Sequence, residues 1–210
     1  MTGARLSRLA AAGAAAVFLL VLGAALRPLL IPETAAPAPV LTAVELGFVQ
    51  DMTAHHQQAL ILTQRLDPAV DPTVRRLADQ IADTQRVEIG TLLGWTQLAG
   101  AAPTSNQPMA WMPENTGHHH DSTAATTTTM PGMATLAELD ALSAARGNAA
   151  ETLFLQLMYR HHAGGITMAR SADSLLTSGA VKQSARAMVQ SQSQELGYLG
   201  VLLDARGVQP

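Results

Sequence analysis

Two short stretches of the chain share a spacing of side chains that can bind metal ions. Residues 48–56 read FVQDMTAHH and residues 154–162 read FLQLMYRHH, so both follow the pattern F-x-Q-x-M-x-x-H-H. At the spacing of an α-helix, the phenylalanine, the methionine and the first histidine fall on one stripe, and the second histidine lies beside it. Imidazole and thioether groups are unusual on an apolar helix face. The pattern therefore predicts two helices that carry candidate metal ligands.

Each motif is followed by another predicted helix with a glutamate in its apolar stripe. An ionised carboxylate that is buried without a partner is strongly destabilising, so each glutamate is expected to be neutral, paired with histidinium or bound to a cation. We expect the histidines to face these glutamates across the bundle. The two stripes are Ile81, Gln85, Glu88, Leu92, Trp95 and Met188, Gln192, Glu195, Leu199, Leu202.

The nearby methionines favour copper as the bound ion. Imidazole suits copper, zinc and iron, whereas thioethers favour Cu(I) in particular, and another transition metal is the alternative. A different interpretation is a buried network of histidine and glutamate that fixes the register of the helices without any metal, with methionine as core filler. The candidate ligands are Met52, His55, His56, Glu88, Met158, His161, His162, Met168 and Glu195.

A second group of candidate ligands lies between the two motifs. Short tracts rich in methionine and histidine are typical of metal binding, although a solvated loop of low complexity has the same composition. The sequence MPGM at residues 130–133 can instead pack against the end of the bundle. The secondary candidates are Met109, Met112, His118, His119, His120, Met130 and Met133.

The elements that must position these residues are helical. Thr42 with Glu45 forms a capping-box pattern that opens a helix, and Asp71 with Pro72 opens the next one, which ends before Gly100. A short helix follows at about residues 135–146, and Asn148 is the predicted cap of the helix that carries the second motif. A last helix runs from about residue 180 to residue 205.

The two halves repeat each other at offsets of 106 and 107 residues, which indicates an internal duplication. We therefore expect an all-α fold, a four-helix bundle built from two helical hairpins with a long crossover insert. The predicted single domain spans residues 42–210. It comprises a first hairpin at 42–100, a Met/His-rich loop at 101–134, and a short helix with the second hairpin at 135–210.

The amino-terminal segment has the pattern of an export signal. Arg5 and Arg8 precede an apolar run over residues 9–26, which Arg27 and Pro28 end. Residues 1–31 are predicted to be a signal peptide or an N-terminal membrane anchor, and an uncleaved anchor is favoured. Residues 32–41 form a spacer rich in proline and alanine. The domain is thus expected outside the cytoplasm, either membrane-anchored or secreted.

Composition excludes several classes of protein. Aromatic residues make up 3% of the chain, which favours closely packed helices over a β-sandwich. There is no cysteine, so neither disulfides nor thiolate metal sites are available. A net charge of -3 without a basic run gives no support for nucleic-acid binding. A homo-oligomer is compatible with the sequence.

The carboxylates are too few for a di-iron centre. Ferritin-like di-iron sites use Glu-x-x-His on two of their helices, whereas Glu88 is followed at this spacing by Thr91 and Glu195 by Tyr198. A metal-dependent oxidase is therefore the third-ranked function. No other catalytic motif stands out, and a binding protein is favoured over an enzyme.

The combined motifs resemble the bacterial domain-of-unknown-function family numbered three hundred and five. The resemblance covers about residues 44–207 and rests on F-x-x-x-M-x-x-H-H, Q-x-x-E, MPGM, and the second HH with the following G-x-x-M. It implies a ferritin-like four-helix bundle, export, and copper binding through Met and His ligands in some members. This chain has Glu151 where the family usually has Asp.

The function expected from the sequence is metal sequestration or handling, with copper as the ion, by an exported four-helix bundle. The alternative is a structural or interaction module whose His and Glu form a core network without metal.

Overall fold

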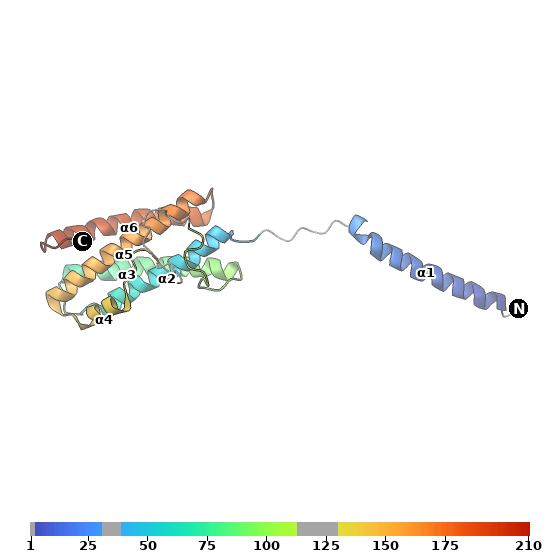
Figure 1. Ribbon diagram of the computed structural model, residues 1–210, viewed down its shortest axis with the longest axis horizontal. Helices are drawn as coiled ribbons and strands as arrows, with labels where there is room; N and C mark the ends of the chain where they lie inside the picture. The colour runs from blue at the N-terminus through green and yellow to red at the C-terminus, as the bar shows by residue number, and fades with distance from the viewer. Residues whose placement is uncertain (1–2, 31–38, 113–129) are drawn as a thin grey trace, which may run out of the picture. The chain divides into compact units, whose positions relative to one another are not determined.

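The structure, a computed structural model, describes residues 3–30, 39–112 and 130–210; within the first range it describes the side chains of residues 13–26. The described residues form six α-helices and no strand (Figure 1). The chain divides into two units, residues 1–38 and residues 39–210. The predicted all-helical fold class is confirmed.

The first unit contains α1 (Gly3–Leu30), which includes the apolar run predicted to be a signal or anchor. Within the described residues, no helix combines the length and the hydropathy that a membrane crossing requires.

The first hairpin consists of α2 (Ala43–Arg65) and α3 (Pro72–Leu98). Both predicted starts are confirmed. Thr42 and Glu45 form a complete capping box on α2. The Asp71 side chain accepts a hydrogen bond from the Thr73 amide, with Pro72 at the first position of α3.

The second half consists of α4 (Leu136–Ala144), α5 (Gly147–Leu175) and α6 (Ala180–Asp204). The predicted cap at Asn148 is wrong, because α5 begins one residue earlier and Arg146 is its N-cap, without a side-chain cap bond. Glu151 is used elsewhere: its carboxylate accepts hydrogen bonds from the Asp71 amide at 2.7 Å and from the Arg206 guanidinium at 2.7 Å. These bonds tie the ends of the two hairpins together.

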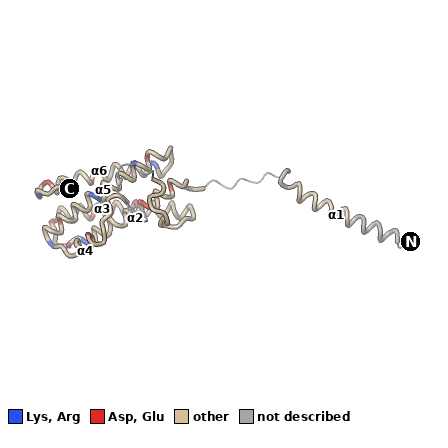
Figure 2. Tube along the Cα trace, in the orientation of Figure 1, with Lys and Arg blue, Asp and Glu red and all other residues tan. Residues whose placement is uncertain are grey.

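The hairpins α2–α3 and α5–α6 meet through their motif-bearing helices, since α2 packs on α5, and α4 covers one end of this contact (Figure 1). Figure 2 shows acidic and basic residues scattered along these helices, as expected for a solvated outer surface.

The core is divided into two apolar clusters. One contains Leu62, Ile81, Phe154 and Leu199, and the other contains Phe48, Leu92, Met168 and Met188. On each of the four long helices, residues of one cluster are followed along the chain by polar residues and then by residues of the other cluster. The polar residues therefore form a layer across the middle of the bundle.

Candidate metal centre

The polar layer receives two residues from each long helix. Adjacent histidines come from α2 and α5, and a glutamine and a glutamate one turn apart come from α3 and α6. Seven of these side chains belong to buried residues, and the side chain of Glu88 is 17% exposed. The layer consists of His55, His56, Gln85, Glu88, His161, His162, Gln192 and Glu195.

The first histidine of each motif lies at the contact between α2 and α5. The rings of His55 and His161 face each other with centroids 3.9 Å apart and planes tilted by 35°. Nε2 of His161 donates to the backbone carbonyl of His55 at 3.0 Å, and Nε2 of His55 donates to the carbonyl of Pro131 at 3.1 Å. The two motifs are thus joined directly.

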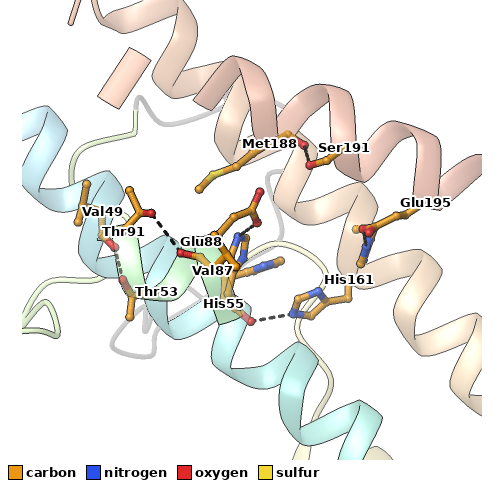
Figure 3. A network of polar contacts seen from close by, with 12 residues as sticks. Val49, Thr53, His55, Val87, Glu88, Thr91, His161, Met188, Ser191 and Glu195 are labelled. Atoms are coloured by element: carbon orange, nitrogen blue, oxygen red, sulfur yellow. Dashed lines mark hydrogen bonds and ion pairs between the residues drawn. The ribbon is translucent and has the colours of Figure 1, made fainter. Parts of the chain in front are cut away.

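The second histidine of each motif contacts the glutamate of its own hairpin. Nε2 of His56 lies 2.7 Å from Oε2 of Glu88, and Nε2 of His162 lies 2.7 Å from Oε2 of Glu195. Figure 3 shows the two glutamates together with His55 and His161. Only the second contact has the angles of a hydrogen bond. The expectation that the glutamates pair with histidines across the bundle is thus refined, because each pair forms within one hairpin.

Burial keeps the central pair of imidazoles neutral. The pKa of His55 is lowered to about 3, first by burial and then by the neighbouring His56. The pKa of His161 is lowered well below its ordinary value, again first by burial and then by His55. A backbone carbonyl can only accept, so the single proton of each neutral ring must be on Nε2. Nδ1 of both rings therefore carries a lone pair.

All four histidines leave the same ring nitrogen free. Nε2 of each one contacts a carbonyl or carboxylate oxygen, whereas Nδ1 of each one is buried without a hydrogen-bond partner among the described residues. Histidines that bind metals commonly donate the other ring N–H to a carboxylate or a backbone carbonyl, which fixes the tautomer and the ring orientation. The imidazoles of the layer are therefore donors of the kind that transition-metal ions bind.

The MPGM turn packs on α5 and supplies one of these carbonyls. A Cβ at Gly164 would lie 2.0 Å from the carbonyl oxygen of Pro131, and Gly132 has a φ of 77° with the carbonyl of Arg160 against it. Only glycine allows this approach at both positions. From the sequence, MPGM is expected at the end of the bundle, whereas the turn packs against the middle of α5, next to the polar layer. The sequence also did not indicate that the turn would contact His55.

The predicted methionine ligands separate into two places. Met158 packs with Phe154 in the apolar cluster that also contains Leu62. Met133 is half-buried and belongs to neither apolar cluster. His118, His119 and His120 lie outside the described residues. A methionine-rich cluster, from three helices and the loop segments, contains Met52, Met109, Met168 and Met188, with Met112 and Met130 packed against it.

The histidines and carboxylates of the described ranges do not by themselves form a group of three or more arranged to hold a metal ion. The rings of His55 and His161 face each other, and this explains part of the result, because ring lone pairs lie in the ring planes rather than between the faces. A metal bound in this layer needs donors of another type, such as thioether or amide groups, beside the imidazoles.

Asp51 is a buried acidic residue that the sequence analysis missed. Its Oδ2 accepts hydrogen bonds from the Met109 amide at 2.6 Å and from the Trp111 indole at 2.9 Å. Burial raises the pKa of Asp51, and these two bonds oppose the rise. Met109 adopts a positive φ of 66°, which is strained for a residue other than glycine. Asp51 thus holds the first part of the Met/His-rich loop against α2. The sequence contains one indication of this role, because Asp51 lies inside the first motif, next to Met52, on a helix that is predicted to be buried.

A family model for a domain of unknown function, DUF305, matches residues 45–203. The chain belongs to the DUF305 family. A DUF305 protein of Streptomyces coelicolor described as secreted has 38% identity and a TM-score of 0.69, covering 79% of this chain and 94% of its own. A DUF305 fragment from Deinococcus radiodurans has 30% identity and a TM-score of 0.62, covering 78% and 97%.

CopM in its Cu(I)-bound form is also similar to this DUF305 chain. It has 22% identity and a TM-score of 0.56, covering 77% of this chain and 96% of its own. The Cu(II)-bound form of CopM has the same identity and a TM-score of 0.54. At this identity the likeness shows the fold alone. No curated protein matches the chain.

Proposed function

We propose that this DUF305 protein binds a transition-metal ion, copper in the first place, in the polar layer, and that it sequesters the ion or hands it on without chemical turnover. The observation that supports the proposal is the state of the four imidazoles. Nε2 of each ring contacts a carbonyl or carboxylate oxygen, and the buried Nδ1 of each ring has no partner among the described residues.

The free-energy cost of burying a ring nitrogen without a partner supports a ligand-binding role for Nδ1. Leaving a buried acceptor without a partner costs about 1–3 kcal/mol, and Nδ1 of His55 and Nδ1 of His161 are two such acceptors. Folding stability alone does not favour this arrangement, whereas a bound cation would give such a lone pair a partner. Unfavourable local arrangements of this kind cluster at functional sites.

The surroundings of the layer support copper. The methionine-rich cluster borders the layer on one side, and Met52, Met168 and Met188 are each fully buried. Thioethers favour Cu(I), and imidazoles accept either oxidation state. The bundle is similar to CopM, which carries copper in both oxidation states.

We infer that the protein acts outside the cytoplasm. The basic and apolar pattern of residues 1–31 is that of an export signal or anchor. The DUF305 relative from Streptomyces coelicolor, which is described as secreted, supports the same location.

A structural role is the second candidate, and one observation favours it. The bond from His161 to the His55 carbonyl joins the two hairpins, and the contacts of His56 with Glu88 and of His162 with Glu195 join the helices within each hairpin. Such a network fixes helix register whether or not a metal is bound.

Glutamine substitutions separate the two functions. The side chain of Gln ends in an NH₂ group that can replace the Nε2–H donor of histidine, but it offers no nitrogen lone pair in place of Nδ1. We expect the variant with all four histidines changed to Gln to fold and to lose copper binding in a titration with Cu(I) against a competing chelator.

The matched control is Met158→Leu, which changes a methionine on the other side of the layer and should leave the affinity close to that of the wild type. Copper affinity that survives in the folded quadruple Gln variant would contradict the proposed site. A wild-type protein that binds no copper in either oxidation state would favour the structural role.

A further inference from the structure

Two glutamines of the polar layer have no role in the network of histidine and glutamate. Gln85 on α3 and Gln192 on α6 are each 1% exposed, and each precedes a glutamate of the layer by one helical turn. Neither the amide oxygen nor the amide nitrogen of either residue has a hydrogen-bond partner within the described ranges. A buried polar group without a partner costs more than an ordinary hydrogen bond contributes.

A buried glutamine that serves the fold has different surroundings in the same protein. Gln58 on α2 donates from Nε2 to the Ala134 carbonyl at 2.9 Å, and its Oε1 accepts from the Ala134 amide at 2.6 Å. Both ends of its amide are therefore satisfied. Gln85 and Gln192 are more enclosed, at 1% exposed against 8% for Gln58, but neither end of their amides is satisfied.

The backbone of α5 makes room for one of these amides beside a histidine. A Cβ at Gly165 would lie 2.4 Å from Oε1 of Gln192 and 3.1 Å from Cε1 of His55. The amide oxygen of Gln192 and the ring of His55, whose Nδ1 has no hydrogen-bond partner among the described residues, therefore both border the space that a side chain at Gly165 would fill. The corresponding residue of the first motif is Ala59, which has a Cβ.

We propose that the amide oxygen of Gln192 is a further ligand atom of the metal centre and that it raises the affinity for Cu(II) relative to Cu(I). The inference rests on the proposed function. The histidines and carboxylates of the described residues need donors of another type to form a centre. An amide oxygen is a harder donor than a thioether, and hard oxygen donors suit divalent ions better than Cu(I).

The position of Gln192 on α6 supports a role for its amide oxygen beside the thioether and carboxylate groups of the same helix. On α6, Met188 lies one turn before Gln192 in the methionine-rich cluster, and Glu195 lies about one turn after it in contact with His162. The same helix therefore presents a soft donor, an amide and a carboxylate in order. Because Gly165 has no Cβ, the amide of Gln192 and the ring of His55 both approach the backbone of α5.

The test compares Gln192→Leu with Gln192→Glu in the full-length chain. For Gln192→Leu we expect the Cu(II) affinity to fall by at least about tenfold, the scale on which even outer partners affect metal affinity. The Cu(I) affinity should not change. Gln192→Glu keeps an oxygen donor and should retain Cu(II) binding.

The metal-free proteins supply a readout that does not depend on copper. Gln192→Leu replaces two buried, unpartnered polar atoms by carbon, so its Tm should rise above that of the wild type. The control is Gln50→Leu, because Nε2 of Gln50 already donates to the Ala102 carbonyl at 2.6 Å. We expect Gln50→Leu to lower or preserve the Tm and to leave both copper affinities unchanged.

The failures of the two proposals are distinguishable. Unchanged Cu(II) affinity in Gln192→Leu, or equal losses for Cu(II) and Cu(I), would overturn the role of Gln192 while leaving copper binding intact. A wild-type chain that binds neither ion would overturn the metal centre itself, and the role of Gln192 with it.

Discussion

At the scale of single residues, the histidines of the layer divide their two ring nitrogens between the fold and a free lone pair. His55 and His161 show this division most clearly, because their Nε2 atoms donate to carbonyls and burial lowers the pKa of both rings. A neutral imidazole with a free nitrogen is the form that binds a metal. The same burial makes the metal-free protein sensitive to acid.

The stability of the metal-free protein should depend on pH through this pair. The unfolded histidines have a pKa of about 6.5, whereas the folded pKa of His55 is about 3. Between these values the unfolded chain binds more protons, so stability is lost as the pH falls below about 6.5, by up to about 1.4 kcal/mol per pH unit for each histidine.

Thermal unfolding measured from pH 8 to pH 4 checks this dependence. The double variant His55→Gln, His161→Gln should have a flatter profile than the wild type, because the substituted side chains do not titrate. Parallel profiles for the two proteins would contradict the assignment of the acid sensitivity to this pair.

Removing one carboxylate should affect both stability and metal binding. Glu195→Ala leaves Nε2 of the buried His162 without its partner, so we expect a loss of about 1–3 kcal/mol in the free energy of unfolding. The copper affinity should fall roughly 10- to 100-fold, as for other partners of metal-bound histidines. Glu195→Gln, which retains an oxygen acceptor, should be less affected in both measurements. A Glu195→Ala protein with wild-type copper affinity would show that this carboxylate does not orient a ligand.

At the scale of elements, the MPGM turn is the connection that couples the loop to the centre. Its Pro131 carbonyl holds His55, and it reaches that position because Gly164 lacks a Cβ. At the other end of the loop, Asp51 holds Met109 and Trp111 against α2. Both ends of the predicted Met/His-rich loop are therefore fixed close to the bundle core.

An alanine at residue 164 should displace the turn. Its Cβ would meet the Pro131 carbonyl at 2.0 Å, so we expect Gly164→Ala to destabilise the fold by about 1–3 kcal/mol and to weaken copper binding. Chemical denaturation and the copper titration measure the two effects.

Gly197→Ala is the matched control for this substitution. Gly197 lies within α6, and a Cβ there meets no atom within 4 Å among the described residues, so the change should stabilise the protein by about 0.4–1 kcal/mol. Similar effects of the two substitutions would mean that the turn does not position His55.

Sequence patterns could predict these elements because capping and periodicity are local. Thr42 and Asp71 each begin a helix in the structure, and their side chains accept the capping hydrogen bonds that the sequence pattern predicts. Asn148 does not, because the chain enters α5 through Gly147 with a φ of 54°, held by Asp67, whose carboxylate accepts from the Gly147 amide at 2.8 Å. That contact spans eighty residues of sequence, and no local pattern contains it.

At the scale of the whole molecule, the organisation of the centre depends on how the hairpins meet. The repeated motifs predict which helices carry histidines, and the contact between α2 and α5 determines that His55 meets His161. Residue types alone could not predict that Met158 and Met52 belong to different apolar clusters. They also could not distinguish Gln192 from the other residues of the predicted core stripe. These distinctions depend on how each helix is rotated about its axis and on which side chain lies against Gly165, and both are visible only in the packed structure.

The second unit should be sufficient for the proposed function. All residues of the polar layer and of the methionine-rich cluster lie within residues 39–210. We expect a protein that begins at Pro39 to be monodisperse and to show the Tm and copper affinity of the full-length chain. A large loss in either property would assign residues 1–38 a part in the domain beyond export or anchoring.

The proton and metal state of the imidazole nitrogens tests the central claim most directly. Long-range ¹H–¹⁵N NMR spectra of the four buried histidines, recorded before and after addition of Ag(I) as a substitute for Cu(I) that is stable to oxidation, distinguish Nδ1 from Nε2. The structure predicts protons on Nε2 of His55 and His161 without metal, and large shifts of Nδ1 resonances of the layer on binding. Protons on Nδ1 of these two rings, or Nδ1 signals that do not change while the ion binds, would contradict it.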